Sequence, residues 1–116
     1  MEEPVTPIPE EWAKAVSSIL YEGDPKKITW TMRAMQDWQA ATGSVFRFEP
    51  EQAMANALSM PGVMGRSVQL QQEKGESYEF LFQHGDVPLY AKICLRPMKQ
   101  AVKIISTHVP LKGPTL

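Results

Sequence analysis

Two histidines, His84 and His108, are the side chains of this 116-residue chain whose ordinary pKa lies closest to neutral pH. A histidine can take a proton from a hydroxyl group or return one to a leaving group at that pH. Tyr90, Lys92 and Arg96 come before His108 in the sequence, and lysine and arginine side chains can hold a phosphate group. Together these residue types could cleave RNA by acid–base catalysis.

Strong cofactor and metal motifs are absent from the sequence. A single cysteine, Cys94, rules out an internal disulfide and any multi-cysteine metal site. There is no phosphate-binding glycine loop, no dinucleotide-binding glycine motif, no HExxH zinc motif and no nucleophile elbow. We therefore expect no metal and no cofactor. His84 adjoins a predicted tight turn, where a polar residue is expected for structural reasons alone.

Composition points to an ordinary globular protein. The formal net charge is −1, whereas nucleic-acid-binding proteins usually carry a basic excess. No apolar run approaches the roughly 18 residues of a membrane span. The acidic, proline-rich N-terminus does not resemble a signal peptide. We predict a cytoplasmic protein with no membrane partner.

Helical spacing of apolar residues dominates the first half of the chain. A first helix is predicted from Pro9 to a stop at Gly23. Asp24-Pro25 predicts the start of a second helix that ends at Gly43, and a weaker third helix follows from Pro50. Trp30 falls off the apolar stripe of the second helix. We therefore predict that it is exposed and could anchor a protein partner.

Alternation of period two dominates residues 66–108 and predicts four antiparallel strands. A turn at Gly85-Asp86 sets Phe82 opposite Leu89, and a loop at 97–100 sets Leu95 opposite Val102. Continued without interruption, the second register sets Leu89 opposite His108. The apolar residues of both registers then share one face, and His108 lies on that apolar face. The opposite face would carry several charged and apolar residues: Glu79, Leu81, Tyr90, Lys92, Cys94, Lys103, Ile105 and Thr107.

These elements predict one α+β domain over residues 1–116. Two to three N-terminal helices would pack on one face of a four-stranded antiparallel sheet. Residues 1–8 and 109–116 are predicted as extended tails, 9–60 as the helical half and 66–108 as the sheet. The two edges of such a sheet leave room for a homodimer.

The segments 89–95 and 102–108, following the helices, resemble the layout of small bacterial ribonuclease toxins of the RelE, MqsR and barnase-like group. The resemblance covers roughly the last 50 residues and concerns layout alone. It implies a metal-independent endoribonuclease that acts on mRNA within a toxin–antitoxin pair. The residues that would carry the reaction are His108, Lys92, Tyr90 and Arg96.

Two functions are therefore open. The first is a small cytosolic, bacterial or phage-type protein that binds another protein and performs no catalysis. Its binding residues would be Trp30, Leu81, Ile105 and Lys103. The alternative is the ribonuclease, with RNA as the partner. We favour binding, because the predicted register separates His108 from the cations on the opposite face.

Overall fold

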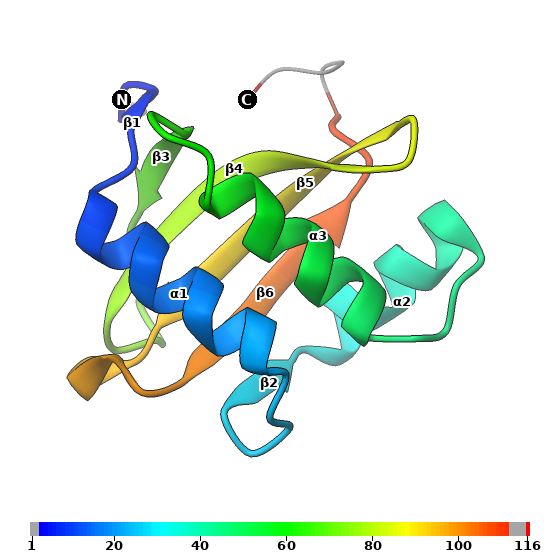
Figure 1. Ribbon diagram of the computed structural model, residues 1–116, viewed down its shortest axis with the longest axis horizontal. Coiled ribbons are helices and arrows are strands. Elements are labelled where there is room, and N and C mark those ends of the chain that lie inside the picture. Colours follow the sequence, from blue (N-terminus) through cyan, green and yellow to red (C-terminus); the bar gives the residue numbers. More distant parts are fainter. Residues whose placement is uncertain (1–2, 112–115) are drawn as a thin grey trace.

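A computed structural model describes residues 3–111 and 116, without side-chain detail at Lys99. Along the chain the elements alternate between strands and helices (Figure 1). They are β1 (Thr6–Pro7), α1 (Glu10–Glu22), β2 (Ile28–Trp30), α2 (Met32–Thr42), α3 (Phe48–Leu58), β3 (Met64–Val68), β4 (Glu76–His84), β5 (Val87–Leu95) and β6 (Val102–His108), with a 3-10 turn at Pro97–Lys99. No helix within the described residues is long and apolar enough to cross a membrane.

The sheet is mixed and has six strands in the order β1-β3-β4-β5-β6-β2. The α+β class is confirmed, and the four predicted strands are present as the antiparallel run β3 to β6. The prediction of a purely four-stranded antiparallel sheet was incomplete. Antiparallel β1 and parallel β2 form the two edges, and strands of two and three residues are too short to show a period in the sequence.

The second helix begins later than Asp24-Pro25 predicts. The backbone N–H of Lys27 donates to the Asp24 carbonyl in a turn, and the chain then enters β2. Helix α2 begins after Thr31, whose hydroxyl accepts from the Ala34 N–H at 3.0 Å. Trp30 therefore lies on a strand, not on the helix where we predicted it.

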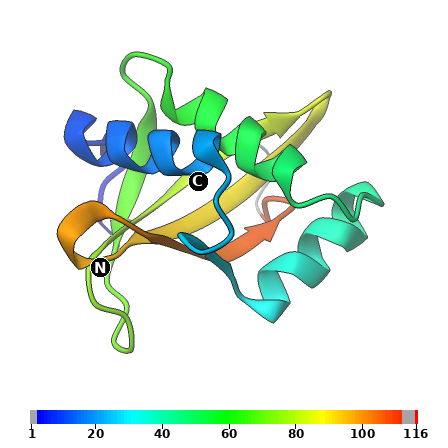
Figure 2. The ribbon, with the colours of Figure 1, turned by 60° about the horizontal axis from the view of Figure 1, so that its bottom comes forward.

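Helices α1 and α3 cover one face of the sheet, whereas α2 packs against β6 near the edge (Figure 2). Gly23 and Gly43 end α1 and α2 at φ 69° and 74°, as predicted, because a left-handed residue closes a helix best when it lacks a side chain. Two residues of the predicted N-terminal tail form β1. Residues 1–2 and 112–115 of the predicted tails lie outside the described residues.

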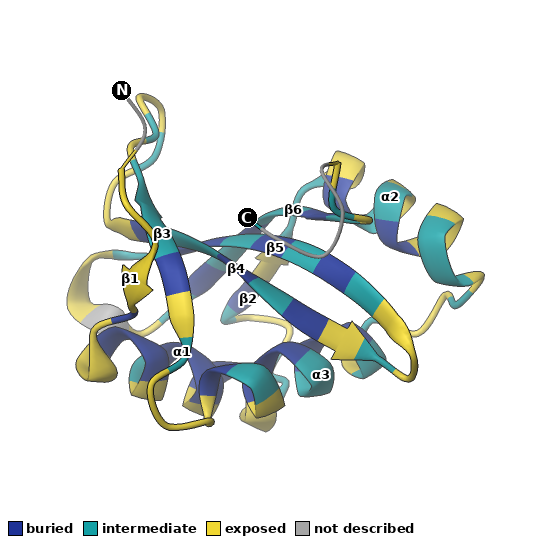
Figure 3. Ribbon diagram, turned by 90° about the horizontal axis from the view of Figure 1, so that it is seen from above, coloured by how far each residue is buried: buried dark blue, intermediate teal, exposed yellow. Residues whose placement is uncertain are grey.

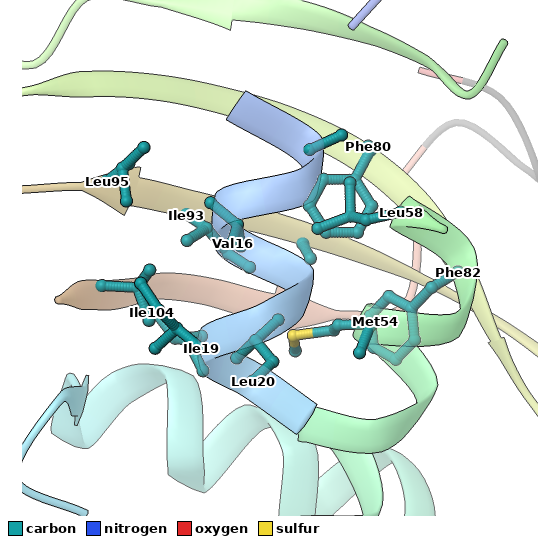
Figure 4. Packing of buried hydrophobic residues seen from close by; sticks show 14 of the residues in the cluster. Val16, Ile19, Leu20, Met54, Leu58, Phe80, Phe82, Ile93, Leu95 and Ile104 are labelled. Atoms are coloured by element: carbon teal, nitrogen blue, oxygen red, sulfur yellow. The ribbon is translucent and has the colours of Figure 1, made fainter. Parts of the chain in front are cut away.

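The core lies between these two helices and the sheet. Val16 and Leu20 of α1 and Met54 of α3 point toward Phe80 and Ile93 of the sheet (Figure 4). All five side chains are fully buried. Trp12 adds edge-on ring contacts to Tyr78 and Phe80, with centroids at 4.9 and 6.5 Å. We call this covered side the inner face of the sheet.

The β4–β5 register agrees with the prediction over its whole length, with Phe82 opposite Leu89. The β5–β6 register agrees only for its first half, with Leu95 opposite Val102 and Ile93 opposite Ile104. Ile105 then has no partner on β5, and the pairing resumes one residue later. This β-bulge reverses the face of every residue that follows it.

The bulge corrects two predictions about the end of β6. Thr107, expected on the polar side, is fully buried on the inner face. His108, expected on the apolar face opposite Leu89, instead pairs with Tyr90 and shares its face. The separation of His108 from the cations, which favoured binding over catalysis, is therefore wrong.

Candidate active site on the outer sheet face

The side of the sheet away from α1 and α3 is here called the outer face (Figure 3). Strand pairing arranges its side chains in rows that run across the strands. One row holds Leu81, Tyr90 and His108; the next holds Arg66, Glu79, Lys92 and Ser106; a third holds Ser77, Cys94 and Lys103. Directly opposite residues in such a ladder lie about 5 Å apart, and diagonal neighbours about 7–8 Å apart.

Four residues from four strands form a connected polar cluster. The Arg66 guanidinium and the Glu79 carboxylate are 3.1 Å apart, and both side chains are largely buried. The other carboxylate oxygen accepts a hydrogen bond from the Tyr90 hydroxyl. The Tyr90 and His108 rings stack, with their centroids 4.6 Å apart and their planes 20° apart. Glu79 was expected to pair with Lys92, which lies opposite it, but its carboxylate is occupied by Arg66 and Tyr90.

Tyr90 is held in its protonated form. Burial raises the pKa of its phenol, and the hydrogen bond and negative charge of Glu79 raise that pKa further. A phenol of raised pKa neither accepts a proton nor attacks at neutral pH. Tyr90 therefore supports the imidazole ring that lies on it, and does not itself exchange protons.

The imidazole of His108 has a defined tautomer. Its Nδ1 lies 2.8 Å from the carbonyl oxygen of Val109. A carbonyl oxygen can only accept, so Nδ1 carries the proton in the neutral ring and Nε2 keeps its lone pair. The residue is partly exposed. Nε2 is therefore the atom that could take a proton from a bound hydroxyl group.

Lys92 lies in the next row, opposite Ser106 and diagonal to His108. It is partly exposed, and within the described residues its ammonium group has no ion pair or hydrogen bond. The diagonal spacing of about 7–8 Å is close enough for one phosphodiester to reach both side chains. The outer face thus places a candidate base beside an uncommitted cation.

Arg96 and Lys103 lie toward the opposite end of the outer face. The β3–β4 loop projects on this side of the sheet (Figure 2). Its Glu73 carboxylate contacts the Lys103 ammonium and lies 3.9 Å from the Arg96 guanidinium. Arg96 follows Tyr90 by six residues, roughly 20 Å along a strand. The structure does not bring Arg96 together with His108.

Cys94 is buried beneath the same loop. Its thiol donates to the Lys74 carbonyl at 3.4 Å. Within the described residues, no group of three or more His, Cys, Asp or Glu side chains could hold a metal ion.

The predicted binding residues are scattered. Trp30 is partly buried against the core, and its indole N–H donates to the Glu51 carboxylate at 2.9 Å. Arg47 Nε donates to the same carboxylate at 2.8 Å, so this buried Glu51 ties α3 to β2. Leu81 lies beside Tyr90 on the outer face, whereas Ile105 is the bulge residue.

His84 lies apart from the cluster. It stacks edge-on against Trp38, with centroids at 4.9 Å, and its Nε2 is 4.0 Å from the Glu49 carboxylate. These contacts join β4 to α2 and α3, in agreement with a structural role.

Sequence reasoning missed Arg66 and Glu79 as parts of the site. Both were visible as charged residues, but their pairing depends on the β3–β4 register. The strand was expected near Val68 and Leu70, whereas β3 begins at Met64. A strand starting at Met64 would have revealed the Arg66–Glu79 pair.

No protein-family model matches the chain, and neither a curated protein nor a solved structure matches it.

Proposed function

We propose that this protein is an endoribonuclease whose active site is the Tyr90–His108 end of the outer face. One observation carries the proposal: the bulge at Ile105 places His108 on the same face as Tyr90 and Lys92. A candidate base of fixed tautomer and a free cation then face solvent together. The layout resemblance to ribonuclease toxins suggests the same reaction class, although the proposal does not depend on it.

The reaction that fits these groups is internal transesterification. His108 Nε2 takes the proton of a ribose 2′-hydroxyl, and O2′ forms a bond to the adjacent phosphorus. The bond from phosphorus to O5′ breaks, and O5′ leaves with a proton from the Lys92 ammonium, which solvent replaces. The products are a 2′,3′-cyclic phosphate and a 5′-hydroxyl end.

The remaining cluster residues position this pair. Tyr90 supports the His108 ring from below, and Glu79 and Arg66 hold Tyr90 through its hydroxyl. Lys92 stabilises the negative charge that develops on the phosphoryl oxygens. Arg96 has no part in this scheme, because Glu73 engages it at the far end of the face.

Purified protein and a single-stranded RNA test the proposal directly. We expect cleavage in the presence of EDTA, with 2′,3′-cyclic phosphate ends identified by mass spectrometry. His108→Ala should lower the rate by about 100- to 10,000-fold, because it removes the base. Lys92→Ala should lower it by about 100-fold. Lys26→Ala, at an exposed lysine before β2, is the matched control and should keep the wild-type rate.

Expression in a bacterial host provides the second arm. Growth arrest with loss of mRNA from the wild type, but not from a His108→Ala, Lys92→Ala double variant, would support the proposal. Intact RNA in vitro together with equal growth of both strains would contradict it.

Binding of a protein partner is a second candidate function, and an exposed apolar segment favours it. Val45, Phe46 and Phe48 between α2 and α3 are 66, 57 and 59 % exposed, and the two phenyl rings contact each other. Exposed apolar clusters of this kind mark interaction sites. A stoichiometric partner recovered from lysate, and lost with Phe46→Ser, Phe48→Ser but kept with Trp30→Ala, would locate it there.

A further inference from the structure

A groove runs from His108 along α2, and the proposed reaction leaves it unused. Its volume is about 450 Å³, within the roughly 300–1,000 Å³ of small-molecule pockets. Arg33, Asp37, Ala40 and Ala41 form its helical wall, since these positions share one stripe of a helix. His108 and the following Val109 and Leu111 form the other wall.

The two walls are fixed to each other at the bulge. The Thr31 hydroxyl donates to the Ile105 carbonyl at 3.0 Å, and the Thr31 N–H donates to the Ile104 carbonyl at 3.1 Å. The same hydroxyl caps the first turn of α2. The start of α2 is thus hydrogen-bonded to β6 three residues before His108. The groove is therefore built by the same irregularity that places His108 on the outer face.

We propose that this groove binds the guanine base of the nucleotide whose 2′-hydroxyl attacks, so that the enzyme cleaves after guanosine. This inference rests on the proposed ribonuclease function. The base and the 2′-hydroxyl belong to the same nucleoside, and His108 lines both the groove and the reaction site. Ala40 and Ala41 are small and leave the helical wall flat enough for a planar ring.

Asp37 selects guanine by its hydrogen-bonding pattern. An ionised carboxylate only accepts, and it can accept two parallel hydrogen bonds. The Watson–Crick edge of guanine presents two neighbouring donors, N1–H and N2–H. On adenine, cytosine and uracil each donor of that edge has an acceptor beside it, which would face the second carboxylate oxygen.

Arg33 lies one turn before Asp37, with its Nε 3.6 Å from the carboxylate and its side chain 85 % exposed. It orients the carboxylate loosely and keeps most of its donors for a phosphate oxygen. The groove therefore offers an acceptor for the base, a cation for the backbone and an apolar floor.

Chimeric oligonucleotides test the specificity. Each is a DNA octamer with one ribonucleotide, G, A, C or U, so that only one phosphodiester has a neighbouring 2′-hydroxyl. We expect the wild type to cleave the riboguanosine chimera about 10- to 100-fold faster than the others. Asp37→Asn, which replaces one acceptor oxygen by an amide donor, should remove this preference and leave the other three rates unchanged. Asp86→Asn, at an exposed turn, should keep it.

Nucleotide binding separates failure of this inference from failure of the proposed function. Guanosine 3′-monophosphate, titrated into the wild type, should shift the backbone amide signals of residues 33–41 more than adenosine 3′-monophosphate does. Equal cleavage of all four chimeras, or a preference that survives Asp37→Asn, would overturn the guanine subsite and leave the ribonuclease standing. Guanosine-specific shifts without any cleavage would overturn the ribonuclease and support the subsite. Neither cleavage nor shifts would overturn both.

Discussion

The two faces of the sheet use neighbouring residues of the same strands in opposite ways. On the inner face, Phe80 and Ile93 lose all contact with water and pack on α1 and α3. On the outer face, Glu79 and Tyr90 stay partly exposed and are joined by directional contacts. Burial scales with apolar area, whereas a polar network depends on particular partners. Stability should therefore reside on the inner face, and chemistry on the outer.

Phe80→Ala should produce the largest loss of stability. The ring is fully buried and contacts Trp12 and Phe82, so truncation leaves a cavity and should lower the free energy of unfolding by about 3–5 kcal/mol. Urea denaturation followed by tryptophan fluorescence measures the change. Leu81→Ala, one residue further on the outer face, is the matched control and should cost about 1 kcal/mol or less. Equal losses at the two positions would show that the faces do not differ in this way.

Gly65→Ala should have an intermediate effect. Gly65 lies opposite Phe80 on β3, and a Cβ there would come 2.6 Å from both the Glu79 carbonyl oxygen and Ile8 Cδ1. Ile8 fills the inner-face space that a side chain would need. The free energy of unfolding should fall by about 1–3 kcal/mol, measured by urea denaturation.

A double variant, Ile8→Ala with Gly65→Ala, tests that cause. Removing the Ile8 side chain relieves part of the clash, so the combined loss should be smaller than the sum of the two single losses. Additive losses would mean that Ile8 is not the obstacle.

Tyr90→Phe should have the smallest effect on stability, about 1 kcal/mol at pH 7, because it removes one hydrogen bond on the outer face. The raised pKa of Tyr90 makes this loss depend on pH. Above about pH 10 the unfolded chain releases the phenol proton while the folded chain retains it, so the wild type loses stability as the pH rises. Chemical denaturation at pH 7 and pH 10.5 should show the two proteins converging. A constant difference would contradict the raised pKa.

Local signals predicted much of the fold. Helix ends at Gly23 and Gly43 and the turn at Gly85-Asp86 depend on residues next to each other in sequence, and all three were predicted correctly. Edge strands β1 and β2 owe their existence to distant partners, so no local period marks them. The same holds for the bulge at Ile105, whose carbonyl is held by Thr31.

The candidate site was predicted in composition but not in arrangement. Tyr90, Lys92 and His108 were selected from their residue types, and one unpaired residue decided whether they could meet. Nothing about an isoleucine in an apolar strand announces that it will be skipped in the ladder. Side-chain parity is therefore reliable only as far as the ladder is regular.

The parallel pairing of β2 with β6 joins Ile28 to Val102, and it has a consequence for synthesis. Strands β3 to β6 pair with neighbours in the sequence, but β2 must wait for β6, which leaves the ribosome after every other strand. His108 ends that strand, and the Thr31 contacts that hold α2 beside it form at the same time. A ribonuclease assembled in this order would have no active site while β6 is still being translated, and the message that encodes it would be out of its own reach.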